Sequence, residues 1–122
     1  MSPLGCYVAG AWRPGGRDRL ARLNPSTGES LGELAVASPQ DVADAVAAAG
    51  EAFGRWRTVT APDRAALLTR AGAAIRARAS EFGRVIATEL GNILPAATFE
   101  AMVAADVMDW SAGEARRIYG RV

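Results

Sequence analysis

The first third of the chain alternates apolar and polar residues over short distances, and turn-forming residues separate the alternating runs. Residues 6–12 form one such run, which a Pro-Gly-Gly turn within residues 13–16 closes. A second short strand is expected at residues 20–23, where it would return from that turn, and a third at residues 30–37 after an Asn-Pro-Ser-Thr-Gly turn. The pattern therefore predicts a small β-ribbon over residues 1–37.

At Ser38 the apolar period changes from about two residues to about 3.6, the period of an α-helix. Ser38 suits the N-cap, Pro39 the first helical position, and Asp41 the acidic position of a capping box. Apolar side chains then recur every three or four residues along one helical face, up to a predicted end near residues 54–56. These side chains are Val42, Val46, Ala49, Phe53 and Trp56.

Two more helices are predicted downstream. A capping pattern at residues 60–63 opens the first, and Gly91 suits its C-terminal cap, because glycine adopts the left-handed conformation without strain. An apolar stripe at helical spacing connects the two ends, and it consists of Leu68, Ala71, Ile75, Ala79, Phe82 and Ile86. The last helix is expected to begin near Pro95 and to run towards Tyr119.

The last predicted helix differs from the other two, because its large apolar residues point in several directions around the axis. They are Phe99, Met102, Val103, Val107, Met108 and Trp110. A helix that is apolar on more than one side is expected to be buried on more than one side. The ribbon and two alanine-rich helices can cover one face, so a further surface is needed to cover the other.

The expected fold class is α+β, with a small N-terminal β-ribbon followed by three α-helices. Periodicity divides the chain into a β-ribbon segment, residues 1–37, and a three-helix segment, residues 38–122. A domain of this size buries roughly two-thirds of the surface that its unfolded chain exposes. Its core is nevertheless expected to be thin, because 27 of the 122 residues are alanines.

Charge and residue usage exclude several classes of function. The chain has 14 basic and 13 acidic residues and a net charge of +1, so we expect neither a nucleic-acid partner nor binding to an anionic membrane. Every basic residue is an arginine, and there is no histidine. A Schiff-base lysine, a histidine base, a Ser/His/Asp triad and a Walker-type lysine are therefore excluded from this chain.

Cysteine usage and hydropathy favour a cytoplasmic protein. Cys6 is the only cysteine, so no intramolecular disulfide can form and no Cys-x-x-Cys pair is present. The first ten residues lack a basic stretch followed by a long apolar run, and no run approaches the roughly 18 apolar residues of a membrane-spanning helix. We therefore expect a protein that is cytoplasmic and does not enter the membrane.

Three groups of residues are candidates for chemistry, and each has a simpler structural interpretation. Cys6 has no neighbouring histidine, lysine or metal motif that would activate its thiol, so a bystander role is favoured over a nucleophilic one. Asp106 and Asp109 can share a helix face, but a solvated helix edge is favoured over acid–base catalysis. For the C-terminal arginines, pairing with a helix dipole is favoured over a binding patch. These are Arg116, Arg117 and Arg121.

Many spaced elements of the chain resemble the aldehyde dehydrogenase superfamily. Residues 7–12, Tyr-Val-Ala-Gly-Ala-Trp, look like its opening strand, and residues 24–29, Asn-Pro-Ser-Thr-Gly-Glu, are similar to its NP-[AS]-TGE turn. Residues 41–56 are in register with a family helix of the D-V-x-x-A-V-x-A-A-x-x-A-F-x-x-W kind. Further matches are Arg64 with Leu67 and Leu68, Glu89-Leu90-Gly91, and residues 112–120. The resemblance covers residues 7–121, and it identifies the chain as the N-terminal segment of such an enzyme.

Within the superfamily the chain resembles the aromatic-aldehyde and semialdehyde dehydrogenases. Asn92 stands where much of the family has lysine, after the glycine of the Glu-Leu-Gly element. Together with residues 93–100, it favours members that oxidise aromatic aldehydes over those for betaine aldehyde or succinic semialdehyde.

The resemblance implies an enzyme several times longer than this chain, which oxidises an aldehyde to a carboxylic acid. In the family a cysteine thiolate attacks the aldehyde, hydride passes to NAD(P)+, and water activated by a glutamate hydrolyses the thioester. No position here matches that cysteine, that glutamate or the Rossmann motifs. We therefore expect no catalytic, cofactor-binding or metal-binding residue in this chain, and NAD or NADP to bind elsewhere in the full-length enzyme.

What the resemblance transfers to this chain is structural. The three helices resemble those that flank the α/β cofactor domain, and the third contributes in the family to the wall of the substrate tunnel. Val103, Asp106 and Trp110 are therefore candidates for tunnel-facing residues.

Three interpretations of function remain open. The chain is a piece of an aldehyde-oxidising enzyme, whose partner is the remainder of that enzyme, including the case of a split enzyme completed by a second chain. Alternatively it is a non-enzymatic binding or regulatory module that self-associates through the third helix. An independent catalyst built on Cys6 is the least favoured.

Overall fold

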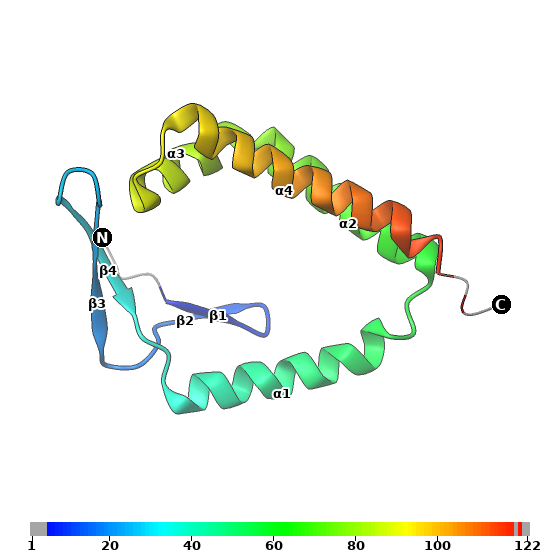
Figure 1. Ribbon diagram of the computed structural model, residues 1–122. Coiled ribbons are helices and arrows are strands. Elements are labelled where there is room, and N and C mark those ends of the chain that lie inside the picture. The colour runs from blue at the N-terminus through cyan, green and yellow to red at the C-terminus, as the bar shows by residue number, and fades with distance from the viewer. Residues whose placement is uncertain (1–4, 119, 121–122) are drawn as a thin grey trace. The chain divides into compact units, whose positions relative to one another are not determined.

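The computed structural model describes residues 5–118 and residue 120. Contacts between residues group the chain into two compact units, residues 1–58 and 59–122. The first unit contains the strands and α1 (Pro39–Trp56), and the second contains the other helices (Figure 1). The periodicity of the sequence places a boundary at residue 38, between the strands and the helices. The contacts in the structure place it after residue 58, so that α1 belongs to the same unit as the strands.

The apolar run at residues 6–12 is a hairpin, and its prediction as a single strand is wrong. β1 (Cys6–Val8) pairs antiparallel with β2 (Ala11–Arg13). Both residues of the connecting loop have positive φ, 52° at Ala9 and 84° at Gly10. Positive φ at both positions is typical of the type I′ turn, whose twist matches that of the paired strands. The pattern of apolar and polar residues does not reveal this turn, because Ala9 is itself apolar and continues the run.

A second hairpin consists of β3 (Arg19–Leu23) and β4 (Ser30–Ala35), paired antiparallel. The expectation that the second strand returns to the first run is therefore wrong, since β3 pairs with β4. Asn24 organises the predicted turn between them, which is confirmed. Its main-chain N–H donates to the Glu29 carbonyl oxygen at 2.8 Å, and its Oδ1 accepts from the Ser26 N–H at 2.9 Å.

The start of α1 is confirmed. Ser38 Oγ accepts from the Asp41 N–H at 3.1 Å, and the Asp41 carboxylate accepts from the Ser38 N–H at 2.9 Å, which completes the capping box. Arg13 of β2 pairs with Asp44, so an ion pair ties the first hairpin to the helix. No residue of α1 is buried, and its apolar stripe is exposed.

The helix predicted from residues 60–63 to Gly91 is divided into α2 (Ala61–Ala77) and α3 (Ala79–Leu90). Three predicted helices therefore become four in the described part of the chain, while the α+β class is confirmed. Arg78 leaves the helical region with φ −113° and ψ 16°, and Gly91 caps α3 with φ 71°, as predicted.

The break at Arg78 has no proline or glycine to announce it, and it follows from tertiary packing. Both α2 and α3 lie against α4 (Leu94–Ala115), with Gly72 of α2 and Gly83 of α3 at the close approaches. At the break, Arg78 Nε and Nη2 donate to the Glu81 carboxylate at 2.8 and 2.7 Å, and its guanidinium lies 5.2 Å from the centre of the Phe82 ring. The break therefore accompanies the packing of both helices on α4.

The start of α4 matches the prediction, with Pro95 in its first turn, and the helix ends at Ala115. Tyr119, towards which the helix was expected to run, lies outside the described residues. Figure 1 shows α4 running beside α2 in the second unit, with α3 near its N-terminal part.

The interior is built from small side chains, which agrees with the expected thin core. In the part of the chain that the structure describes, the buried apolar residues are Val8, Ala35, Ala65, Ala79, Ala97, Ala101, Ala105 and Ala112. Alanine brings helix backbones close together but removes little apolar area from water. Among the described residues, no helix combines the length and apolar character that crossing a membrane requires.

Candidate functional site

The candidate site lies on α4, which presents two different faces. Its inner face, Ala97, Ala101, Ala105 and Ala112, is 0–6% exposed and packs within the helical unit. Its outer face, as we use the term, consists of Phe99, Val103, Asp106 and Trp110. Because successive helical residues are rotated by about 100°, these four residues lie roughly opposite the alanines. The small side chains of the inner face therefore pack α4 against its neighbours, while the large side chains of the outer face remain exposed.

The three residues predicted to face a substrate tunnel come together on this outer face. Val103, Asp106 and Trp110 are spaced by three and four residues, and they are 41%, 69% and 72% exposed respectively, the value for Asp106 referring to its side chain. Exposure of a valine and a tryptophan side by side leaves a sizeable apolar surface open. The structure places the three residues on one surface, and their role in a tunnel stays a prediction.

Phe99 extends the outer face by one helical turn, and the sequence-based prediction missed it. It lies four residues before Val103 and is 67% exposed. The same spacing rule that relates Val103 to Trp110 could have found it. Two aromatic side chains, Phe99 and Trp110, thus flank a valine and a carboxylate.

Arg76 of α2 holds the carboxylate at the edge of the outer face. Its Nη2 atom donates to Asp106 Oδ1 and to Asp109 Oδ2, both at 2.8 Å. These hydrogen bonds, first that of Asp106, raise the pKa of Arg76 above its usual value. The cluster of Arg76, Asp106 and Asp109 has one positive and two negative charges, so its net charge is −1. It links α2 to α4 and fixes the position of Asp106.

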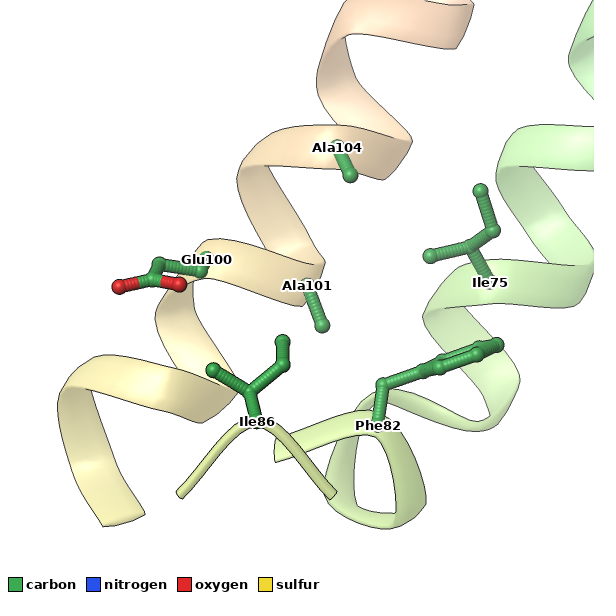
Figure 2. Close-up of a pocket in the computed structure, with 6 residues that line it drawn as sticks. All are labelled: Ile75, Phe82, Ile86, Glu100, Ala101 and Ala104. Atoms are coloured by element: carbon green, nitrogen blue, oxygen red, sulfur yellow. The ribbon is translucent and has the colours of Figure 1, made fainter. Parts of the chain in front are cut away.

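An apolar groove lies elsewhere in the same unit. It has a volume of about 350 Å³ and is lined by Ile75, Phe82, Ile86, Glu100, Ala101 and Ala104. Figure 2 shows the side chains of Ile75 and Ile86 turned towards the alanines of α4, whereas the Glu100 carboxylate points away from them. Apart from Glu100, the residues that line the groove are apolar.

Asn92, the departure from the family pattern, pairs with the helix that follows it. Its Nδ2 donates to Glu100 Oε1 at 2.7 Å, and its Oδ1 accepts from the Ile93 N–H at 2.8 Å. The asparagine therefore orders the connection between α3 and α4, where no side-chain cap opens α4.

The other candidates are not assembled into a reactive site. Cys6 is half-buried in β1, and Arg117 pairs with Glu114 at 3.0 Å, while Arg121 lies outside the described residues. Within residues 5–118 and 120, no group of three or more His, Cys, Asp or Glu side chains is arranged to hold a metal ion.

A comparison with protein-family models decides the relationship of this chain. The model described as "Aldehyde dehydrogenase family" matches residues 12–122. The chain belongs to the aldehyde dehydrogenase family. It is an N-terminal segment of such a protein, because it spans about a quarter of the length of the relatives that it matches.

Individual relatives of this aldehyde dehydrogenase segment include one enzyme named for an aromatic compound and one named for an aliphatic semialdehyde. A 4-(hydroxymethyl)benzenesulfonate dehydrogenase of Comamonas testosteroni is 42% identical over 116 residues, which are 94% of this chain and 24% of the relative. The mitochondrial succinate-semialdehyde dehydrogenase of Homo sapiens is 34% identical over 116 residues, covering 95% of this chain and 22% of the relative.

Solved structures agree with the fold of the segment. The NAD-dependent benzaldehyde dehydrogenase of Corynebacterium glutamicum superposes with a TM-score of 0.91 at 26% identity, covering 97% of this chain and 26% of that one. The succinate-semialdehyde dehydrogenase of Burkholderia pseudomallei superposes with a TM-score of 0.88 at 32% identity, over 94% of this chain and 24% of that one.

Proposed function

We propose that this chain is the N-terminal portion of an NAD(P)-dependent enzyme that oxidises an aldehyde to a carboxylic acid. In this proposal the catalytic cysteine, the glutamate base and the NAD or NADP site belong to the remainder of the enzyme. The chain itself contributes packing surfaces and part of the substrate tunnel, and it is not catalytic alone. The single cysteine, which allows no internal disulfide, favours a cytoplasmic location.

The observation that carries the proposal is the division of α4 into two faces. The alanines of the inner face already fix the helix against its neighbours, so the exposed Phe99, Val103 and Trp110 are not needed for packing within the unit. Apolar side chains of this size usually become buried against a partner or a ligand. A substrate tunnel completed by the rest of an aldehyde dehydrogenase supplies both.

An aromatic aldehyde is the substrate class that we favour. Phe99 and Trp110 offer two aromatic rings on the outer face, and offset or edge-on packing of a substrate ring against such side chains is favourable. Two proteins similar to this chain are named for compounds with a benzene ring. The departure from the family pattern at Asn92 is the other feature that favours this class.

A chimeric enzyme tests the proposal. Residues 5–118 of this chain replace the matching segment of the Corynebacterium glutamicum benzaldehyde dehydrogenase, and reduction of NAD is followed with benzaldehyde as substrate. The proposal predicts an active chimera, while the same enzyme without any N-terminal segment is expected to be inactive. A folded, soluble chimera without activity would contradict it.

The alternative of a non-enzymatic module predicts a different result. In that case the chain alone would unfold cooperatively and have one defined mass in solution, and it would not restore activity to the shortened enzyme. Mixing the chain with the shortened enzyme also tests the variant in which the enzyme is split between two polypeptides.

A further inference from the structure

We propose that Asp106 makes the substrate tunnel selective against aldehydes that bear a negative charge. The inference rests on the proposed function, because it requires the outer face of α4 to meet the substrate. It goes beyond that function by naming one residue and one class of excluded substrate.

The position of Asp106 is the first step. It lies between Val103 and Trp110 on the outer face, and its side chain is 69% exposed. Its Oδ1 atom accepts a hydrogen bond from Arg76 Nη2 at 2.8 Å, which favours a position of the carboxylate beside the apolar residues. A substrate that passes along Phe99, Val103 and Trp110 therefore passes a carboxylate in a defined place.

The charge of the cluster is the second step. Arg76 faces two carboxylates, Asp106 and Asp109, and cannot neutralise both. The remaining charge of −1 lies at the edge of an apolar surface, where a covering protein wall would exclude water. Charges interact more strongly where water is displaced, so an anionic group on a substrate is repelled and a cationic group is attracted.

The third step is the choice of substrate that this surface accepts. Phe99 and Trp110 suit an aromatic ring, and the uncompensated carboxylate disfavours a carboxylate or sulfonate on that ring. An uncharged aromatic aldehyde meets both conditions.

A series of benzaldehydes with different charges tests the inference in the chimeric enzyme. The substrates are benzaldehyde, 4-carboxybenzaldehyde and 4-(trimethylammonio)benzaldehyde, and kcat/KM is measured for each. We expect the anionic substrate to be at least about tenfold poorer than benzaldehyde. The Asp106→Asn variant should raise kcat/KM for the anion about tenfold and lower it for the cation.

Asp109→Asn is the matched control. The variant removes one negative charge that pairs with Arg76, as Asp106→Asn does. Asp109, however, is rotated around the helix axis by about 60° from Asp106, away from Val103 and Trp110. Its effect on the charged substrates should be clearly smaller. Asp106→Glu, which keeps the charge, should preserve the order of the three substrates.

Opposite changes for the anion and the cation are the signature of an electrostatic role. Equal losses for all three substrates in Asp106→Asn would show a structural role and overturn the inference. So would an anion that is used as well as benzaldehyde before any substitution. In both cases activity with benzaldehyde leaves the proposed function intact, whereas a folded chimera that is inactive with benzaldehyde overturns both.

Discussion

Gly83 of α3 lies directly against Thr98 of α4, so that a Cβ atom at Gly83 would come within 2.8 Å of Thr98 Cα. A main-chain atom cannot turn aside as the end of a flexible side chain can. Gly83→Ala is therefore predicted to lower the free energy of unfolding by about 1–3 kcal/mol, although alanine is otherwise the better helix former. Denaturant unfolding followed by circular dichroism measures the change.

Gly50→Ala in α1 is the control for this prediction. A Cβ atom at Gly50 would meet nothing within 4 Å. Because no contact opposes the substitution, only the higher helix propensity of alanine changes the stability. The free energy of unfolding should therefore rise by up to about 1 kcal/mol. Equal and positive effects at Gly50 and Gly83 would contradict the close approach of α3 to α4.

The capping box at the start of α1 gives a second prediction. Ser38→Ala removes the oxygen that accepts from the Asp41 N–H, and it should cost about 1 kcal/mol of stability. Ser38→Asp supplies another acceptor and should restore most of the loss. Hydrogen exchange of the first-turn amides of α1 reports the effect locally; unchanged exchange in Ser38→Ala would count against the cap.

The ion pair between Arg13 and Asp44 predicts a pH dependence. The hydrogen bond from Arg13 lowers the pKa of Asp44 below its usual value. A carboxyl group with a lowered folded-state pKa stabilises the fold above its unfolded pKa of about 3.9, and this stabilisation is lost as the pH falls through the folded value. The contact between β2 and α1 should therefore weaken only in acid.

Asp44→Asn separates this contribution from general acid unfolding. The variant should be less stable than the parent at about pH 7, and the difference should vanish towards about pH 2. Thermal unfolding across the pH range measures it. A difference that persists undiminished at the acid end would show that the asparagine disturbs α1 in some other way.

The two faces of α4 should respond differently to added volume. Ala105 is 0% exposed, so Ala105→Leu forces extra atoms into the packed side and should cost about 1–3 kcal/mol. Val103 on the outer face is 41% exposed, and Val103→Leu should change stability by less than about 0.5 kcal/mol. Paired denaturation curves test the contrast, and similar losses in both variants would argue against an open outer face.

Local signals predicted the helix ends well. Ser38, Thr60 and Gly91 all cap helices in the structure, because each acts on main-chain groups within a few residues of itself. The hairpin at Ala9 and Gly10 was missed, since alanine rarely adopts positive φ and Gly10 was the only turn-forming residue within the apolar run. The break at Arg78 was missed because contacts with α4, distant in the sequence, determine it.

The candidate site shows the same limit. Val103, Asp106 and Trp110 were found through the family resemblance, and helical spacing brings them onto one surface. Arg76 was not found, because it precedes Asp106 by 30 residues and meets it only after α2 and α4 pack together. The charge of the outer face, on which the proposed selectivity depends, is therefore a property of the tertiary structure.

The alanines on the inner face of α4 also bear on how this segment can diversify. The side of the helix that packs within the unit and the side that we propose meets a substrate share no residue, so exchange of Phe99 or Trp110 leaves the contacts of Ala101 and Ala105 in place. Under the proposed function, mutational libraries confined to the outer face can therefore vary the aldehyde that is accepted with little risk to folding.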